Sequence, residues 1–182
     1  MRYFIDRSSS KFTVRAFATG MLSSFGHSPT FAIRDFEGDV DFSPDALSAG
    51  ALHLKVRADS LEVMDDVKNK DRQEIESTMN ESVLESAKYP EISFAGTGVS
   101  ASPLGENRYR AAVNGNLTLH GSTQPVSIAT QVTLLGDMLR ASGEFPLSQA
   151  SFGIAPVRVA AGALKIKDEL KVSFDIVARK QD

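Results

Sequence analysis

The stretch from Tyr109 to Leu134, YRAAVNGNLTLHGSTQPVSIATQVTL, constrains the fold most, because it predicts two long β-strands joined by a loop. Leu117 and Leu119 alternate with polar residues in its first half, and four aliphatic residues do so in its second half. Such alternation is typical of strands that bury one face. Between the halves, residues 121–125 are typical of a loop. A hairpin of this length cannot bury its apolar face alone, so we expect further strands to close around it.

Other parts of the chain show the same alternation and predict about eight substantial strands in all. The run from Thr30 to Phe42 changes the phase of its alternation partway, which is typical of a bulge or a tight bend. Gly96 and Gly98 indicate a bend in another strand. The predicted strands lie near residues 3–5, 12–16, 30–42, 52–56, 92–98, 109–119, 126–134, 139–147 and 170–178.

Two segments depart from the β pattern. Residues 60–88 are rich in charge and contain neither Gly nor Pro, so they predict a helix. Asp65 or Asp66 can cap its start, and Pro90 restricts the residue before it and should end it. Residues 148–167 contain Gly and Pro and predict a long loop.

These elements predict an all-β fold, an eight-stranded antiparallel barrel with one helical crossover segment, over residues 1–182 as a single domain. Closure of the sheet removes the unpaired edges that an open sheet would expose. A barrel of eight strands is either filled by its own side chains or holds one small ligand. The function therefore depends on what the interior contains.

Composition argues against several functional classes. The formal net charge is -3 with scattered Lys and Arg, so no nucleic acid partner is expected. The chain has no Cys, which excludes disulfides, thiolate catalysis and Cys-based metal sites. No apolar run approaches 18 residues, so no transmembrane segment is expected. No secretion signal is visible, which predicts a cytoplasmic protein, or a periplasmic one if a signal has been removed.

Several motifs occur in a fixed order along nearly the whole chain. The most specific are Tyr89-Pro90-x-Ile92-x-Phe94 and Gly115-x-Leu117-Thr118-Leu119-x-Gly121, the latter followed by Thr123-x-Pro125-Val126. With FIDRSSSKFTV, FEGDVDF, ASFGI and DELKVSFDIVA, they resemble the YceI-like family of polyisoprenoid-binding proteins. The resemblance implies a lipocalin-like barrel that holds a long isoprenoid chain, and it implies no catalytic residue and no cofactor.

We therefore interpret the chain as a non-catalytic protein that binds or transports a long-chain isoprenoid lipid, such as a quinone tail or a polyprenyl phosphate. In one alternative, the apolar side chains fill the barrel and the protein is an interaction module. Whether the chain forms a homodimer is left open. The side chains expected to line the lipid-binding interior are Phe12, Val14, Phe31, Ile33, Leu54, Phe94, Leu117, Leu119, Val132, Phe145 and Phe174.

The rim of the barrel supplies the remaining candidates. Met64 and Met79 of the helical segment are expected to contact the end of the lipid, because thioethers adapt to variable shapes. His27, in a predicted loop at residues 20–29, is expected at the rim or headgroup, or as the base of a barrel enzyme in a second alternative. His53 and His120 are expected on the surface. No metal site is expected, because the chain has no His-Glu-x-x-His motif and no close His pair.

Overall fold

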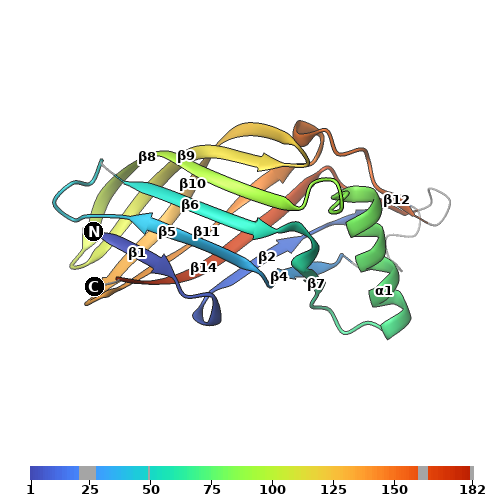
Figure 1. The fold of residues 1–182 in the computed structure, drawn as a ribbon, viewed down its shortest axis with the longest axis horizontal. Helices are drawn as coiled ribbons and strands as arrows, with labels where there is room; N and C mark the ends of the chain where they lie inside the picture. The colour runs from blue at the N-terminus through green and yellow to red at the C-terminus, as the bar shows by residue number, and fades with distance from the viewer. Residues whose placement is uncertain (21–27, 49, 160–163, 181–182) are drawn as a thin grey trace.

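The predicted hairpin is present and forms one side of a β-barrel (Figure 1). The computed structural model describes residues 1–20, 28–48, 50–159 and 164–180, and its elements are those of this part of the chain. Buried and exposed residues alternate along strand β9 (Arg108–Leu119), as predicted, and β10 (Ser122–Leu135) pairs with it along its length.

Most of the remaining structure is β. The other strands are β1 (Arg2–Ile5), β2 (Lys11–Arg15), β3 (Ala18–Thr19), β4 (Thr30–Ile33), β5 (Phe36–Asp41), β6 (Ala51–Arg57), β7 (Leu61–Val63), β8 (Glu91–Gly105), β11 (Met138–Ser148), β12 (Arg158–Val159), β13 (Leu164–Ile166) and β14 (Glu169–Lys180). The helical segments are α1 (Asn69–Thr78), the π-helical turn η3 (Met79–Val83) that continues it, and the 3₁₀ turns η1 (Arg7–Ser9), η2 (Ala58–Ser60) and η4 (Ala150–Phe152).

The main sheet closes on itself. Its strand order is β1-β5-β6-β8-β9-β10-β11-β14-β2-β4-β7, and β14 pairs with both β1 and β2. Three neighbouring barrel strands are each interrupted once, giving the pairs β1 and β2, β4 and β5, and β6 and β7. The eleven segments therefore make eight strands, and the predicted closed antiparallel barrel with one helical crossover is confirmed.

The three interruptions lie side by side and bend the barrel wall. Serine hydroxyls complete the hydrogen bonding there, because the backbone ladder is broken. The Ser10 hydroxyl accepts from the Val177 N–H at 2.9 Å and donates to the Val177 carbonyl at 3.1 Å. The Ser60 hydroxyl accepts from the Asp35 N–H at 3.1 Å. The phase change predicted between residues 30 and 42 is this bend between β4 and β5.

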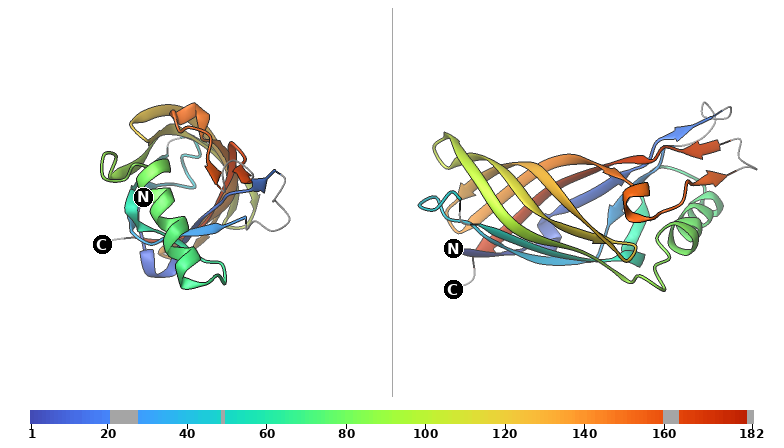
Figure 2. Two further views of the ribbon diagram at one scale, coloured as in Figure 1. Left: turned by 90° about the vertical axis from the view of Figure 1, so that its right-hand side faces the viewer. Right: turned by 90° about the horizontal axis from the view of Figure 1, so that it is seen from above.

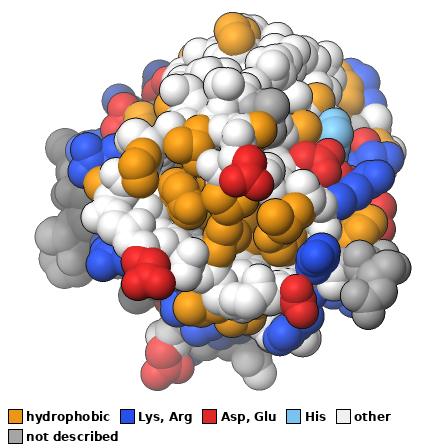
Figure 3. All heavy atoms as spheres, turned by 90° about the vertical axis from the view of Figure 1, so that its left-hand side faces the viewer, with side chains coloured by type: hydrophobic (Ala, Val, Ile, Leu, Met, Phe, Trp, Pro, Cys, Tyr) orange, Lys and Arg blue, Asp and Glu red, His pale blue; other side chains and the backbone are white. Residues whose placement is uncertain are grey.

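One end of the barrel is filled by side chains, and we call it the closed end. Among the described residues, Tyr3 and Leu139 are the largest fully buried side chains, and both belong to this cluster. Phe42 packs edge-on against Tyr109 with ring centroids 5.3 Å apart. Figure 3 shows apolar side chains gathered at the centre of this end, with charged side chains around them.

The helical segment is shorter than predicted. Residues 58–60 form η2 and residues 61–63 form β7, so the α-helix begins only at Asn69. Asp65 caps no helix, since its carboxylate accepts the Thr30 N–H at 2.7 Å. The predicted loop at residues 148–167 also contains η4, β12 and β13, and β13 joins β12 and β3 in a small three-stranded sheet. Such short elements depend on tertiary pairing rather than on local pattern.

The turn of the long hairpin is also tighter than predicted. It consists of His120 and Gly121, both with positive φ (53° and 70°), and β10 begins at Ser122. Two residues with positive φ favour a tight hairpin whose twist matches that of its strands. Pro125 therefore lies within β10, opposite Asn116, rather than in a loop.

Candidate binding cavity

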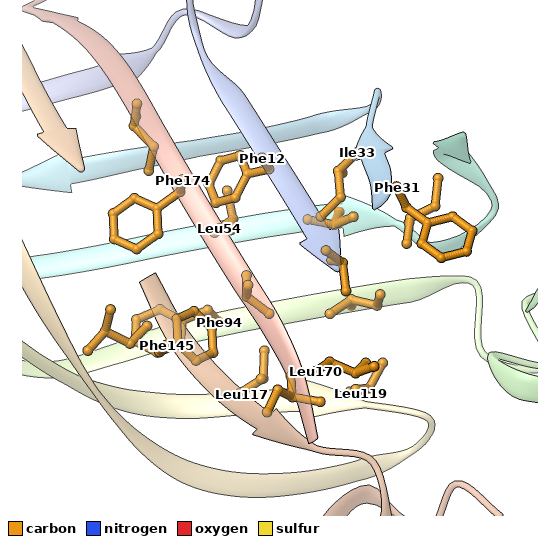
Figure 4. A pocket seen from close by; sticks show the side chains of 18 of the residues that line it. Phe12, Phe31, Ile33, Leu54, Phe94, Leu117, Leu119, Phe145, Leu170 and Phe174 are labelled. Atoms are coloured by element: carbon orange, nitrogen blue, oxygen red, sulfur yellow. The ribbon is translucent and has the colours of Figure 1, made fainter. Parts of the chain in front are cut away.

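The barrel interior contains a cavity of about 480 Å³ (Figure 4). This volume lies within the range of roughly 300–1,000 Å³ that is usual for ligand sites. Its wall is almost entirely apolar and comes from nearly every barrel strand. All of the side chains that the sequence indicated for the interior lie on this wall, namely Phe12, Val14, Phe31, Ile33, Leu54, Phe94, Leu117, Leu119, Val132, Phe145 and Phe174.

Glycines on the wall explain why large aromatic side chains leave space between them. A methyl group added at Gly143 would lie 2.8 Å from Cζ of Phe174, the residue opposite it on β14. A methyl group at Gly115 would likewise collide with the ring of Phe94. Each ring therefore lies over the bare backbone of the neighbouring strand. Because the rings lie along the wall, the centre of the barrel stays empty.

The cavity is long and narrow. Leu139 and Leu147 of β11 both line it and lie eight positions apart, which is about 27 Å at about 3.4 Å per residue. With the usual barrel tilt of about 40°, this corresponds to a depth of roughly 20 Å. Leu139 and Val132 belong to the closed-end cluster, which forms the floor. The shape suits an extended chain better than a compact molecule.

The cavity opens beside α1, at the end opposite the floor. Ile75 and Met79 of the crossover face the cavity and belong to its wall, and Met79 is buried. The exposed carboxylates Asp71 and Glu74 also border the cavity, so it reaches solvent there. Figure 2 shows α1 lying across this mouth. The small β3–β12–β13 sheet lies on the other side and contributes Ile166.

The candidate rim residues differ in whether they line the cavity. Met79 is on the wall, whereas Met64 is 53% exposed and is not among the residues that line the cavity. Residue 64 follows β7 and precedes α1 instead of lying within the helix, and its contact with the lipid stays a prediction. His27 lies outside the described residues.

Two side chains of α1 complete the free edge of β7. The Glu76 carboxylate accepts the Val63 N–H at 2.9 Å. The Arg72 guanidinium donates to the Val63 carbonyl and, at 2.9 Å, to the Asp65 carbonyl. β7 pairs with β4 on its other side, so these contacts stand where a neighbouring strand would be. The helix is thus attached to the mouth by hydrogen bonds to β7 and to the residues that follow it.

The interior offers few polar groups. The Gln149 amide donates to the Lys167 carbonyl at 3.0 Å, and the Thr130 hydroxyl donates to the Ile128 carbonyl at 3.3 Å. Both groups are therefore already paired within the protein. Among the described residues, the wall has no Lys, Arg or His. Such a surface selects a ligand body by shape and apolar contact rather than by hydrogen bonding.

His120 is not the surface residue that its strand position suggested. As a turn residue, it lies against Tyr89 with ring centroids 4.6 Å apart, and its side chain is only 12% exposed. Its Nε2 contacts the Glu85 carboxylate, and its Nδ1 lies 3.3 Å from the Phe152 carbonyl. It joins the end of the helical crossover to the β9–β10 turn and to η4. His53 is exposed, as predicted, beside Asp39.

Some wall residues escaped the sequence analysis. Ile154 and Val157 lie in the segment predicted as loop, where no periodicity marks them. Ile75 lies four residues before Met79, and that helical spacing predicts that the two side chains share one face of the helix, which here borders the cavity.

The chain is similar to known proteins over most of its length. A family model described as YceI-like domain matches residues 3–178. No curated protein matches the sequence. No helix in the described part of the chain combines the length and apolarity needed to cross a membrane.

Solved structures with low sequence identity share the fold. The crystal structure of Burkholderia cenocepacia BcnA has a TM-score of 0.73 at 19% identity, covering 95% of this chain and 98% of that one. A polyisoprenoid binding domain from Saccharophagus degradans, implicated in plant cell wall breakdown, has a TM-score of 0.70 at 14% identity, covering 98% of both chains. A Campylobacter jejuni YCEI protein has a TM-score of 0.62 at 12% identity, covering 82% and 84%.

Proposed function

This chain belongs to the YceI-like family, and on that premise we propose that its barrel binds and transports a long-chain isoprenoid lipid without catalysing a reaction. The ligand is a quinone tail or a polyprenyl phosphate. The observation that carries the proposal is the long apolar cavity of about 480 Å³, which a barrel filled by its own side chains would not have. The polyisoprenoid binding domain of similar fold supports the choice of lipid.

The energetics of the cavity agree with this function. Burial of apolar surface contributes about 25 cal/mol per Å², so an isoprenoid that buries roughly 300 Å² gains about 7.5 kcal/mol before the costs of association. The apolar wall supplies this favourable free energy along the whole length of the isoprenoid, whichever headgroup the lipid carries. Met79 contacts the lipid near the mouth, and the headgroup stays close to α1.

Native mass spectrometry of the purified protein, followed by organic extraction and mass analysis of what it carries, tests the proposal. We expect a stoichiometric adduct that releases an isoprenoid. Protein that carries nothing and takes up neither ubiquinone nor polyprenyl phosphate would contradict it. Steady turnover of a small molecule that His27→Ala abolishes would instead favour an enzyme.

A matched pair of variants tests whether the cavity is the site. Leu117→Trp adds volume inside the cavity, whereas Asn116→Trp adds the same side chain on the outer face of the same strand. We expect the first to abolish uptake and the second to retain it, with circular dichroism showing that both variants fold. Equal uptake by both would place the lipid elsewhere.

A further inference from the structure

The small sheet at the mouth has one basic face. Arg158 of β12 and Lys165 of β13 are directly opposite in the register, so their side chains lie on the same face. Arg15 and Lys167 are also exposed in this region. The Lys167 N–H donates to the Phe17 carbonyl at 2.8 Å, and the Arg15 guanidinium lies 5.4 Å from the centre of the Phe17 ring. We call Arg15, Arg158, Lys165 and Lys167 the basic face.

The four cations have no acidic partner in the described part of the chain. The ion pairs there, defined by N···O distances up to 4.0 Å, involve other residues. The nearest carboxylate in the sequence, Asp168, instead accepts the Ser148 hydroxyl at 2.6 Å and the Ala150 N–H at 2.7 Å. In the sequence, residues 21–27 and 160–163 include no Asp or Glu.

Placing Arg158 opposite Lys165 costs stability, because like charges directly across a strand pair repel each other. The chain as a whole does not share this excess, since its formal net charge, with these four cations included, is -3. The protein is acidic overall, yet it keeps this cationic surface although the repulsion between its charges lowers stability. Such a surface indicates an anionic partner.

The direction in which the basic face points limits which anionic partner can bind it. Ile166 follows Lys165 in β13 and lines the cavity, so the side chain of Lys165 lies on the opposite face of the sheet. The cations therefore face away from the cavity, and the headgroup of a bound lipid would meet Asp71 and Glu74 instead. Figure 2 shows this sheet extending beyond the barrel on the side of the mouth away from α1.

We propose that the basic face docks the mouth of the barrel onto an anionic lipid bilayer. Cations beside an aromatic ring, as Arg15 lies beside Phe17, suit the surface of a bilayer, where the ring reaches below the headgroups. Docking there brings the mouth to the place where isoprenoids reside, so the lipid passes between bilayer and cavity without crossing water. The purpose of docking, which is lipid exchange, rests on the proposed function. The docking itself depends only on the basic face.

Flotation of the ligand-free protein with vesicles that contain no isoprenoid tests the docking. We expect it to float with phosphatidylcholine vesicles that contain phosphatidylglycerol, and not with phosphatidylcholine alone. Binding should disappear at about 1 M salt, where the screening length is about 3 Å. Each cation near an anionic surface contributes about a fivefold change in partitioning, which is about 1 kcal/mol. Arg158→Gln with Lys165→Gln should therefore weaken binding about 25-fold.

The matched control removes the same charge at the other end of the barrel. Arg108 and Arg110 of β9 are exposed near the closed end, and Arg108→Gln with Arg110→Gln should leave vesicle binding unchanged. Equal loss in the two double variants would overturn the proposal, because net charge alone would then explain binding. Absence of wild-type flotation would also overturn it and favour an acidic protein as partner. Uptake of detergent-solubilised isoprenoid, measured in parallel, reports on the cavity alone. It therefore distinguishes a failure of membrane docking from a failure of the proposed isoprenoid binding.

Discussion

The two ends of the barrel are made from the same strands, yet one is packed and the other is hollow. At the closed end, Tyr3 and Leu139 are 2% and 1% exposed and fill the interior. Towards the mouth, Phe94 and Phe174 lie over glycines and leave a cavity. Strand number and tilt are shared, so they do not decide whether a barrel is filled. The difference depends on where glycines allow large rings to lie against the wall.

The largest difference between the ends should appear in stability. Leu139→Ala at the closed end should lower the free energy of unfolding by about 2–5 kcal/mol, because Leu139 is 1% exposed, packs within the closed-end cluster and borders the cavity only at its floor. Leu170→Ala, on the adjoining strand but partly exposed at the mouth, already borders empty space and should cost about 1 kcal/mol. Urea unfolding of both variants measures the difference. Equal losses would mean that the two ends are packed alike.

A substitution at Gly143 should convert part of the hollow region into packed core. A methyl group there would lie 2.5 Å from the Ala129 carbonyl oxygen and 2.8 Å from Phe174, so the ring must move into the cavity. We expect Gly143→Ala to cost about 1–3 kcal/mol of stability and to weaken isoprenoid uptake, measured by native mass spectrometry. Gly98→Ala, with no atom within 4 Å of the added methyl, is the control and should change neither property.

Loss of the attachment of α1 to β7 should have a smaller effect on stability, and that effect should be confined to the mouth. Glu76→Ala leaves the Val63 N–H without its partner and should cost about 1 kcal/mol. Hydrogen exchange at Val63 should speed up while that of the closed-end strands is unchanged, and lipid uptake should become faster. Gln73→Ala, at an exposed position of the same helix, is the control. Unchanged uptake in Glu76→Ala would show that the helix does not limit access.

The smallest effect concerns the bend between β1 and β2. Hydrogen bonds from the Ser8 and Ser9 side chains, and then from Arg179, hold the pKa of Asp6 well below its usual range. A lowered folded-state pKa stabilises the protein above the unfolded value of about 3.9, and this stabilisation is lost as the pH falls below it. Asp6→Asn should therefore be less stable than wild type at neutral pH, with the difference shrinking as the pH is lowered to about 2.

Thermal unfolding of both proteins across this pH range measures the effect. Arg179→Gln, which removes one of the donors to Asp6, should change the pH dependence in the same direction but by less. A constant difference between wild type and Asp6→Asn at every pH would show that the carboxylate charge is not what stabilises the bend.

The barrel could be predicted because its strands carry their own pattern. Alternation with a period of two identifies the inward residues of β9 and β10, such as Leu117 and Ile128, and hence much of the cavity wall. The mouth could not be predicted in this way. β7 has three residues and β12 has two, too few for periodicity to show.

The contacts at the mouth join residues that are distant in sequence. His120 meets Glu85 across 35 positions, and His120 looks like a strand residue until its positive φ places it in a turn. Glu76 resembles an ordinary exposed helix residue, although its carboxylate completes a strand edge. These roles follow from three-dimensional placement and leave no local mark in the sequence.

Because its floor is packed, the cavity sets a maximum length for the part of a chain that it can enclose. Under the proposed function, an isoprenoid that enters tail first would stop where its end reaches Phe42 and Leu139, which belong to the packed closed-end cluster. Chains shorter than the depth leave part of the wall bare, and longer ones keep their last units outside. The residues that would select the length of the bound chain therefore lie at the end of the molecule farthest from where that chain would enter.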